Sequence, residues 1–153
     1  MRSILTPSFR ILALAAVLLA AAIAPAAAVT SATYEKQVIT RTNTHRANHD
    51  RVAVRAQTCA DRWAEGQARW MAKHKTLKHR SGRLRQIIED CDFAGVSENI
   101  AYGYASGNRT VDAWMTSSGH RANILATSMR YIGVGAVKDG HGVWWVSQVF
   151  GRK

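Results

Sequence analysis

The chain has 153 residues, of which 21 are Lys or Arg and 10 are Asp or Glu, so its formal net charge at pH 7 is +11. This length allows one domain with a real hydrophobic core and excludes two domains of ordinary size. A composition this basic favours polyanionic partners, and the first residues of the chain decide which polyanions it would meet.

Residues 1–28 predict a secretory signal peptide. Arg2 and Arg10 form its basic region, residues 11–24 are apolar, and the three alanines at 26–28 provide a cleavage site. The apolar run is shorter than the ~20 residues that a membrane span needs, and an uncleaved anchor is the alternative. We therefore expect a secreted, extracellular protein of residues 29–153 that is a single domain, has no transmembrane span and is a monomer.

The charge that remains after cleavage is still strongly positive. Only two of the basic residues and none of the acidic ones lie in residues 1–28, so residues 29–153 keep a net charge of +9. Their densest basic stretch is KHKTLKHRSGRLR, at residues 73–85. Outside the cell it would meet a polyanionic wall or matrix polymer or anionic lipid, and we expect no nucleic-acid partner. The alternative is a solvated loop that only keeps the protein soluble.

Two cysteines, Cys59 and Cys91, are present in this chain. An even number of cysteines in an exported protein predicts a disulfide. Closing a loop of this length would stabilise the fold by roughly 3–4 kcal/mol if the bridge acts on the unfolded chain. The alternative is a catalytic thiol, but neither cysteine has the surroundings of a papain-type nucleophile.

The first part of residues 29–153 has the pattern of helices. Residues 33–48 follow a helical period, and residues 52–56 form a short extended link. A second helix is predicted over residues 57–74, whose apolar positions recur every three or four residues. The period then stops, and residues 75–96 predict a basic loop with a short helical piece at LRQIIED.

Short elements of both kinds follow. We expect a strand or turn over residues 97–104, a helix over residues 109–117 capped by Asn108 or Thr110, and a short helix at GHRANILA capped by Ser118. The last two elements, YIGVGAVKD and GVWWVSQVFG, are rich in β-branched and aromatic residues. The intervening Asp-Gly-His-Gly predicts a hairpin between them.

The two C-terminal strands also predict what covers them. In the first, Gly133 and Gly135 leave one face without side chains, so another element must approach that face closely. The second strand is apolar on nearly both faces, which is typical of a central strand covered twice. Early helices and a late hairpin in a doubly covered central sheet predict an α+β fold, a three-layer α-β-α sandwich.

Histidines and acids supply the candidate chemistry. His45 and His49 lie four residues apart on a helix, a spacing that can bind zinc, but no third ligand is near and a solvated helix end is the better interpretation. A second set combines His79, Glu98 and His120, each at the start or end of a predicted element. Two imidazoles and a carboxylate suit an open divalent-metal site or a general base with an electrostatic partner.

Several segments together resemble a known family. They are LKH, SENIAYGY, VDAWMTSSGHRANIL, YIGVGAV and WVSQVFG, in this order, with NTHRA earlier in the chain. The chain is similar to the cysteine-rich secretory protein, antigen 5 and pathogenesis-related 1 superfamily, the CAP or SCP domain, and most to its compact prokaryotic exported members. The resemblance covers roughly residues 33–151.

The resemblance implies an α-β-α sandwich with a central cleft lined by two histidines and two acids. By motif, His79 and His120 match the histidines and Glu98 matches one acid. Ser117 stands where the family has its second acid. Asp112, one turn away, is not an obvious substitute.

Three hypotheses for function follow. The first is a secreted binding module whose cleft, formed by His79, Glu98, His120 and Ser117, holds a divalent cation such as zinc, or an anionic or lipid ligand. The second is a peptidase-like extracellular hydrolase in which His79, Glu98 and His120 bind metal or activate water, or His120 serves a neighbouring serine. The third is a non-catalytic envelope or stress protein in which these residues only hold the cleft together. Members of the superfamily differ in biochemistry, so the fold does not choose among the three.

Overall fold

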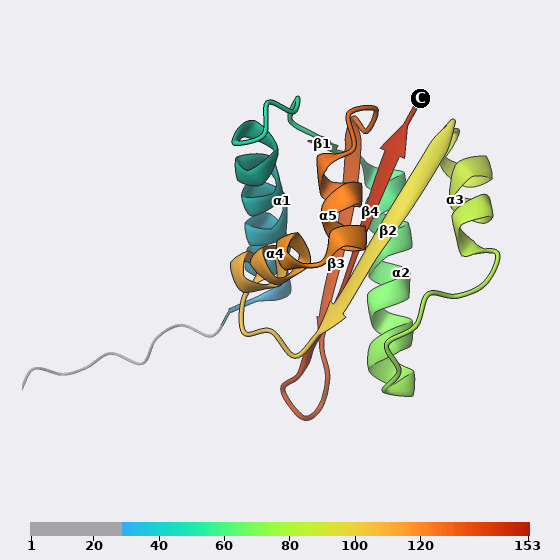
Figure 1. Cartoon of the computed structure of the whole chain (residues 1–153). Helices are drawn as coiled ribbons and strands as arrows, with labels where there is room; N and C mark the ends of the chain where they lie inside the picture. The colour runs from blue at the N-terminus through green and yellow to red at the C-terminus, as the bar shows by residue number, and fades with distance from the viewer. Residues whose placement is uncertain (1–28) are drawn as a thin grey trace, which may run out of the picture.

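A computed structural model describes residues 29–153 (Figure 1), and the predicted signal peptide lies outside the described residues. Among the described residues, no helix combines the length and apolar character needed to cross a membrane. The helices are α1 (Ser31–Ala47), α2 (Thr58–His74), α3 (Arg83–Cys91), α4 (Gly107–Thr116) and α5 (Ser118–Leu125). The strands are β1 (Arg55–Ala56), β2 (Gly95–Tyr102), β3 (Tyr131–Lys138) and β4 (Trp144–Arg152).

The four strands form one sheet in the order β1-β3-β4-β2. β3 and β4 are the predicted C-terminal hairpin and pair antiparallel, as do β4 and β2, whereas the short β1 adds parallel to β3. β4 is therefore central, and its residues from Trp144 to Gly151 are buried. β2 is an edge strand, and this position determines where the candidate site lies.

Helices cover both faces of the sheet, as predicted. α1, α4 and α5 lie on one side and α2 and α3 on the other (Figure 1). The first layer packs around Tyr34, Trp114 and Phe150. The second packs in two smaller clusters, one around Ile87 and Val149 and one that includes the face of α2 near its C-terminal end. The α-β-α sandwich predicted from the sequence is confirmed.

The close approach predicted at Gly133 and Gly135 is made by α2. A Cβ atom on Gly133 would lie 2.1 Å from the backbone carbon of Ala60, and one on Gly135 would lie 2.3 Å from the Cα of Glu65. Real Cβ atoms do not come this near to backbone. Glycine at both positions lets α2 lie directly on the sheet.

Element boundaries differ from the prediction in several places. The link at 52–56 ends in strand β1, β2 begins at Gly95, and α3 spans Arg83–Cys91. The cap of α4 is Ser106, whose hydroxyl accepts from the backbone N–H of Arg109, and neither Asn108 nor Thr110 is the cap. The residue before α5 is Ser117, not Ser118, and its side chain makes no capping hydrogen bond.

Candidate functional site: a cleft along the outer edge of the sheet

The candidate site lies along the free edge of β2. The N–H of Gly103, just after β2, donates to the backbone oxygen of Trp144 on β4. Given the antiparallel register, the backbone N–H and C=O groups of the odd-numbered β2 residues therefore point to β4. Those of the even-numbered residues point outward, away from the sheet. Two hollows open beside this edge. The first, of about 570 Å³, is lined by His79, Arg80, Ser81, Gly82, Leu84, Arg85, Val96, Ser97, Glu98 and Asn123. The second, of about 340 Å³, is lined by Leu77, Ile100, Ala101, Tyr102, Tyr104, Ala113, Trp114, Thr116, Ser117 and His120.

Glu98 is the buried centre of the first hollow. Its carboxylate holds His79 Nδ1 at 2.8 Å on one oxygen and Arg83 Nε at 3.4 Å on the other, to which Ser147 Oγ also lies at 3.4 Å. The side chain of Glu98 is 2% exposed and that of Arg83 4%. A buried carboxylate needs such partners because desolvation of an unpaired charge is costly. The structure thus brings two of the three predicted residues into contact and adds Arg83, which the sequence did not indicate.

The loop that carries His79 is held at several points. The side-chain amide of Gln67, buried on α2, donates to the backbone oxygen of Lys78, and its oxygen accepts from Arg80 Nε. At the end of α2, Lys75 adopts a left-handed conformation (φ 52°), and its ammonium contacts the carboxylate of Asp139 in the β3–β4 turn. The pKa of Asp139 is held well below its usual range, chiefly by the Lys75 ammonium and then by the indole N–H of Trp145. His79 therefore lies on an anchored loop. Glu98 binds its Nδ1, which leaves Nε2 available to another partner.

His120 comes from the opposite wall of the cleft, near the start of α5. Its backbone oxygen accepts from the amide of Asn99 on β2 at 3.3 Å, and its ring lies 6.3 Å from the ring of Trp114. The same Asn99 accepts from Asn123 at 2.9 Å, so α5 is hydrogen-bonded to the sheet over nearly one turn. The imidazole of His120 lines the second hollow rather than the first.

A buried arginine fixes the far end of α5. Arg46, with no exposed surface, donates from its guanidinium to the backbone oxygens of Val52, Ile124, Ala126 and Met129. Three of these carbonyls belong to the end of helix α5 and the loop after it, where intrahelical partners are lacking. The Asn-x-x-Arg segment at the end of α1 therefore serves to place α5, and with it His120.

The two imidazoles have opposite electrostatic surroundings. The hydrogen bond to Glu98 raises the pKa of His79, against a smaller opposing effect of burial. Burial lowers the pKa of His120, and the nearby charge of His79 lowers it further. His79 therefore favours the cation and His120 the neutral form, which can accept a proton or a hydrogen bond.

The structure places Ser117 beside the second hollow and Asp112 outside both hollows. Ser117 lines the second hollow as a neutral hydroxyl. Asp112 lies outside both hollows and pairs with Arg41 at 2.7 Å and with His45 Nε2 at 2.9 Å. These contacts, chiefly the one with Arg41, lower the pKa of Asp112. Asp112 therefore does not replace the second acid of the cleft. His45 is bound to Asp112, and His49 is bound to the backbone oxygen of His45, so the two histidines do not share a ligand.

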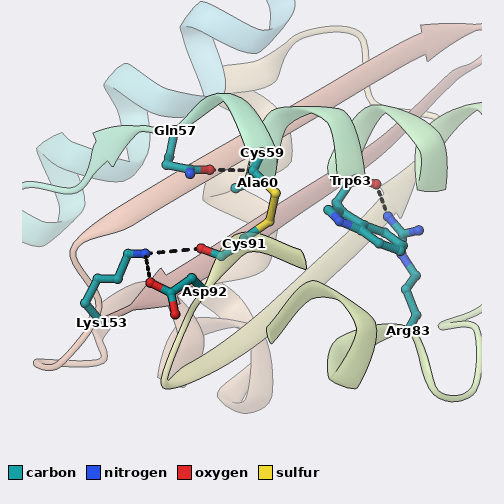
Figure 2. Close-up of a disulfide and its surroundings, with 8 residues drawn as sticks. All are labelled: Gln57, Cys59, Ala60, Trp63, Arg83, Cys91, Asp92 and Lys153. Atoms are coloured by element: carbon teal, nitrogen blue, oxygen red, sulfur yellow. Dashed lines mark hydrogen bonds and ion pairs between the residues drawn. A yellow bond between two sulfur atoms is a disulfide. The ribbon is translucent and has the colours of Figure 1, made fainter. Parts of the chain in front are cut away.

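Cys59 and Cys91 form the predicted disulfide (Figure 2). It joins the start of α2 to the end of α3. At the other end of α3, Arg83 donates to the backbone oxygen of Trp63, so α3 is tied to α2 at both ends (Figure 2). The catalytic-thiol alternative is excluded, because both sulfurs are bonded to each other.

The described residues contain no group of three or more His, Cys, Asp or Glu arranged to hold a metal ion. Both oxygens of Glu98 are engaged by side chains, and Ser117 offers no charge. A metal ion here would rely on the two imidazoles. For His79 this would use Nε2 with Glu98 behind the ring, the usual arrangement of a histidine ligand and its supporting carboxylate.

Sequence reasoning missed the aromatic part of the second hollow. Tyr102, Tyr104 and Leu77 are 52%, 39% and 45% exposed. Tyr102 lies almost parallel to the buried indole of Trp145, with ring centroids 4.9 Å apart and 16° between the planes. The signal in the sequence was the pair of tyrosines in SENIAYGY, which stand four and six residues after Glu98.

The family model "CAP: Cysteine-rich secretory protein family" matches residues 39–150. That range includes the four predicted cleft residues, His79, Glu98, Ser117 and His120, and nearly the whole sheet. The chain belongs to this family, and its relatives in bacteria place it with the prokaryotic type.

Among curated proteins, the chain is 31% identical to the uncharacterized protein YkwD of Bacillus subtilis (strain 168), over 78% of this chain and 48% of YkwD. Among solved structures, it is similar to an extracellular SCP-domain protein of Bacillus anthracis str. Ames (TM-score 0.71, 24% identity, 80% of this chain and 41% of that one). It is also similar to an outer surface protein of Borrelia burgdorferi (TM-score 0.70, 20% identity, 77% and 91%). The chain thus spans about half the length of YkwD, and the likeness to solved structures concerns the fold.

Proposed function

We propose that this chain is a secreted ligand-binding module whose cleft holds an anionic ligand or a divalent cation between His79 and His120. The observation that carries the proposal is the anchored, half-exposed imidazole of His79, fixed by the buried Glu98. A fixed donor on one wall and a neutral imidazole on the other form a recognition site without further rearrangement. The names of the relatives, an extracellular protein and an outer surface protein, support secretion.

Calorimetric titration with zinc tests the cation. Heat of binding in the wild type that is lost in His79→Ala and in His120→Ala is the expected result, because two imidazoles would supply the protein ligands. His45→Ala is the matched control, since His45 serves an ion pair outside the cleft. No heat in the wild type rejects the cation and leaves the anionic ligand, which titration with acidic and neutral oligosaccharides tests.

We propose binding rather than serine-based hydrolysis because no serine hydroxyl of the described residues is hydrogen-bonded to a histidine of the cleft. A serine nucleophile would be hydrogen-bonded to its base. Within residues 29–153 neither His79 nor His120 makes a hydrogen bond to a serine hydroxyl, and the Ser97 hydroxyl, buried in the first hollow's wall, has no partner. Turnover of a peptide and ester panel that is lost in His120→Ala would reverse this choice.

A further inference from the structure

The exposed apolar side chains of this protein gather at one place. Five large hydrophobic residues are exposed among those described, and four of them line the two hollows of the cleft: Leu77, Leu84, Tyr102 and Tyr104. Within residues 29–153 the fifth, Val52, lies elsewhere. Scattered exposed apolar residues need no explanation, whereas a group of them beside polar side chains marks a binding surface.

One tyrosine of this group, Tyr102, is held as a flat platform. One face of Tyr102 lies on the indole of Trp145, and that indole is fixed by its N–H bond to Asp139 at 2.9 Å. Nearby, the hydroxyl of Tyr34 donates to the backbone oxygen of Tyr104 at 3.0 Å and fixes the following turn. The half-exposed ring of Tyr102 is therefore available to a ligand with little loss of side-chain freedom on binding.

Polar groups suited to hydroxyls border the platform. Ser117 lines the same hollow, and its hydroxyl makes no hydrogen bond to residues 29–153. His120, whose imidazole favours the neutral form, lines it as well. A flat aromatic ring beside uncharged donors and acceptors matches a sugar ring, which has an apolar C–H face and a rim of hydroxyls.

The neighbouring hollow adds positive charge. Arg80 and Arg85 line it together with His79. The side chain of Arg85 is 85% exposed, and its only partner among the described residues is the exposed carboxylate of Glu89 at 3.2 Å, a surface pair that solvent weakens. Along β2, Glu98 and Tyr102 are four residues apart, roughly 13 Å at the usual rise of a strand. A chain of a few sugar rings would reach from the platform to these cations.

The edge of β2 is closed to the other ligand of similar shape, an extended peptide. A peptide added as a strand would need the outward carbonyls of β2. The carbonyl of Ile100 already accepts from Trp114 Nε1 at 3.1 Å, and that of Glu98 lies 3.4 Å from Asn123 Nδ2. These side chains occupy the carbonyls that an added strand would need. A ligand bound through its rings and charges therefore fits this edge better than a peptide bound through its main chain.

We propose that the second hollow is a sugar-binding subsite in which a pyranose ring stacks on Tyr102, and that the ligand is an acidic polysaccharide whose carboxylates lie against Arg80 and Arg85. This inference rests on the proposed binding function and names the ligand class of the same cleft. Tyr102 supplies stacking, Ser117 and His120 bond hydroxyls, and the arginines select for charge. Arg80 is itself positioned by Gln67 and by the ring of Trp70.

The test uses two oligosaccharides of equal length on the folded chain of residues 29–153: an oligogalacturonate, which is acidic, and a cello-oligosaccharide, which is neutral. Binding is followed by tryptophan fluorescence, because Trp145 lies under the platform, and by calorimetry. The wild type should bind the acidic oligomer more tightly than the neutral one. Tyr102→Ala should weaken both by about ten-fold, equivalent to ~1.4 kcal/mol, and Tyr102→Phe should restore most of the affinity.

Further variants test the role of the two arginines and the location of the site. Arg80→Gln with Arg85→Gln should remove the preference for the acidic oligomer and leave the neutral one unaffected. Val52→Ala, an exposed apolar site away from the cleft, is the matched control and should bind as the wild type does. No binding of either oligomer, equal binding by Tyr102→Ala, or tighter binding of an acidic peptide of similar length would each overturn the proposal. Zinc binding without binding of either oligomer would reject this inference alone, whereas failure of zinc and of both oligomers would reject the proposed function as well.

Discussion

At the scale of single residues, the two imidazoles of the cleft should titrate apart. We expect NMR titration of the imidazole C–H signals to give His79 a pKa above its ordinary value of 6.5 and His120 a pKa below it. In Glu98→Gln the pKa of His79 should fall, because its charged acceptor is lost. In His79→Gln the pKa of His120 should rise only in part, because burial, the larger cause of its shift, remains. Identical pKa values in the wild type would contradict this assignment.

The raised pKa of His79 also has a consequence for stability. A group that binds its proton more tightly in the folded state stabilises that state fully below its unfolded pKa, near 6.5, and loses this contribution as pH rises through the folded pKa. Urea unfolding should therefore show the largest advantage of the wild type over His79→Gln below pH 6.5, with a decline above it. The effect should be small because the side chain is 56% exposed and solvent screens the pair. An advantage that grows with pH would reverse the sign and refute the pairing.

The sequence predicted His79 and Glu98 as site residues, but not the rest of their environment. Arg83 and Ser147 reach the Glu98 carboxylate from α3 and β4, and no local pattern marks such contacts across the fold. The stretch 73–85 looked uniformly basic, although within it Arg83 is buried against Glu98 and Lys75 is bound to Asp139. Charge on a loop predicts solvation, and only tertiary structure shows which charges are paired.

At the scale of elements, the glycines of β3 set the distance to α2. Gly133→Ala should destabilise the fold by about 2–3 kcal/mol, because the new methyl group would meet the backbone at Ala60, which cannot move without shifting the helix. Gly140→Ala in the hairpin turn is the control, since nothing lies within 4 Å of its Cβ position. The measurement is the free energy of unfolding in urea. Equal losses in both variants would show that backbone flexibility, not the approach of α2, is what glycine supplies.

The disulfide between α2 and α3 makes a second prediction at this scale. Replacing Cys59 and Cys91 together by alanine should lower the free energy of unfolding by about 3–4 kcal/mol, since the bridge closes a loop with a sequence separation of 32. The pKa of His79 should change little, because Glu98 is carried by β2. A large change there would mean that the bridge also positions the site through α3.

Helix starts show why boundaries were harder to predict than elements. Ser106, Asn108 and Thr110 are all good N-caps by residue type, so local preference could not choose among them. The choice follows from a contact with a distant helix, in which the N–H of Gly107 donates to the side-chain oxygen of Gln37 at 2.9 Å. Similarly, two residues suffice for β1, which exists only because β3 offers an edge.

At the scale of the whole molecule, the sandwich followed from the sequence because its central strand is apolar on both faces and its neighbour has glycines on one face. The division of the cleft into a charged hollow and an aromatic one did not follow, because it depends on where the loop after α2 and the start of α5 meet the edge of β2.

The predicted export of the protein has a direct test. N-terminal sequencing of the protein recovered outside the producing cell should give a chain that begins at Val29. A start at Met1 would support an uncleaved anchor.

The net charge of the molecule makes the last prediction, on the role of the basic stretch at 73–85. Retention on an anionic polymer column should fall as salt rises, since the screening length is about 8 Å at physiological ionic strength. Lys73→Gln with Lys78→Gln should elute earlier than Lys36→Gln with Arg109→Gln, although both pairs remove the same charge. All four side chains are exposed and make no salt bridge to the described residues, but only the first pair belongs to the basic stretch 73–85 that carries His79. Equal elution would mean that the overall charge holds the polymer, with no contribution from the position of the stretch.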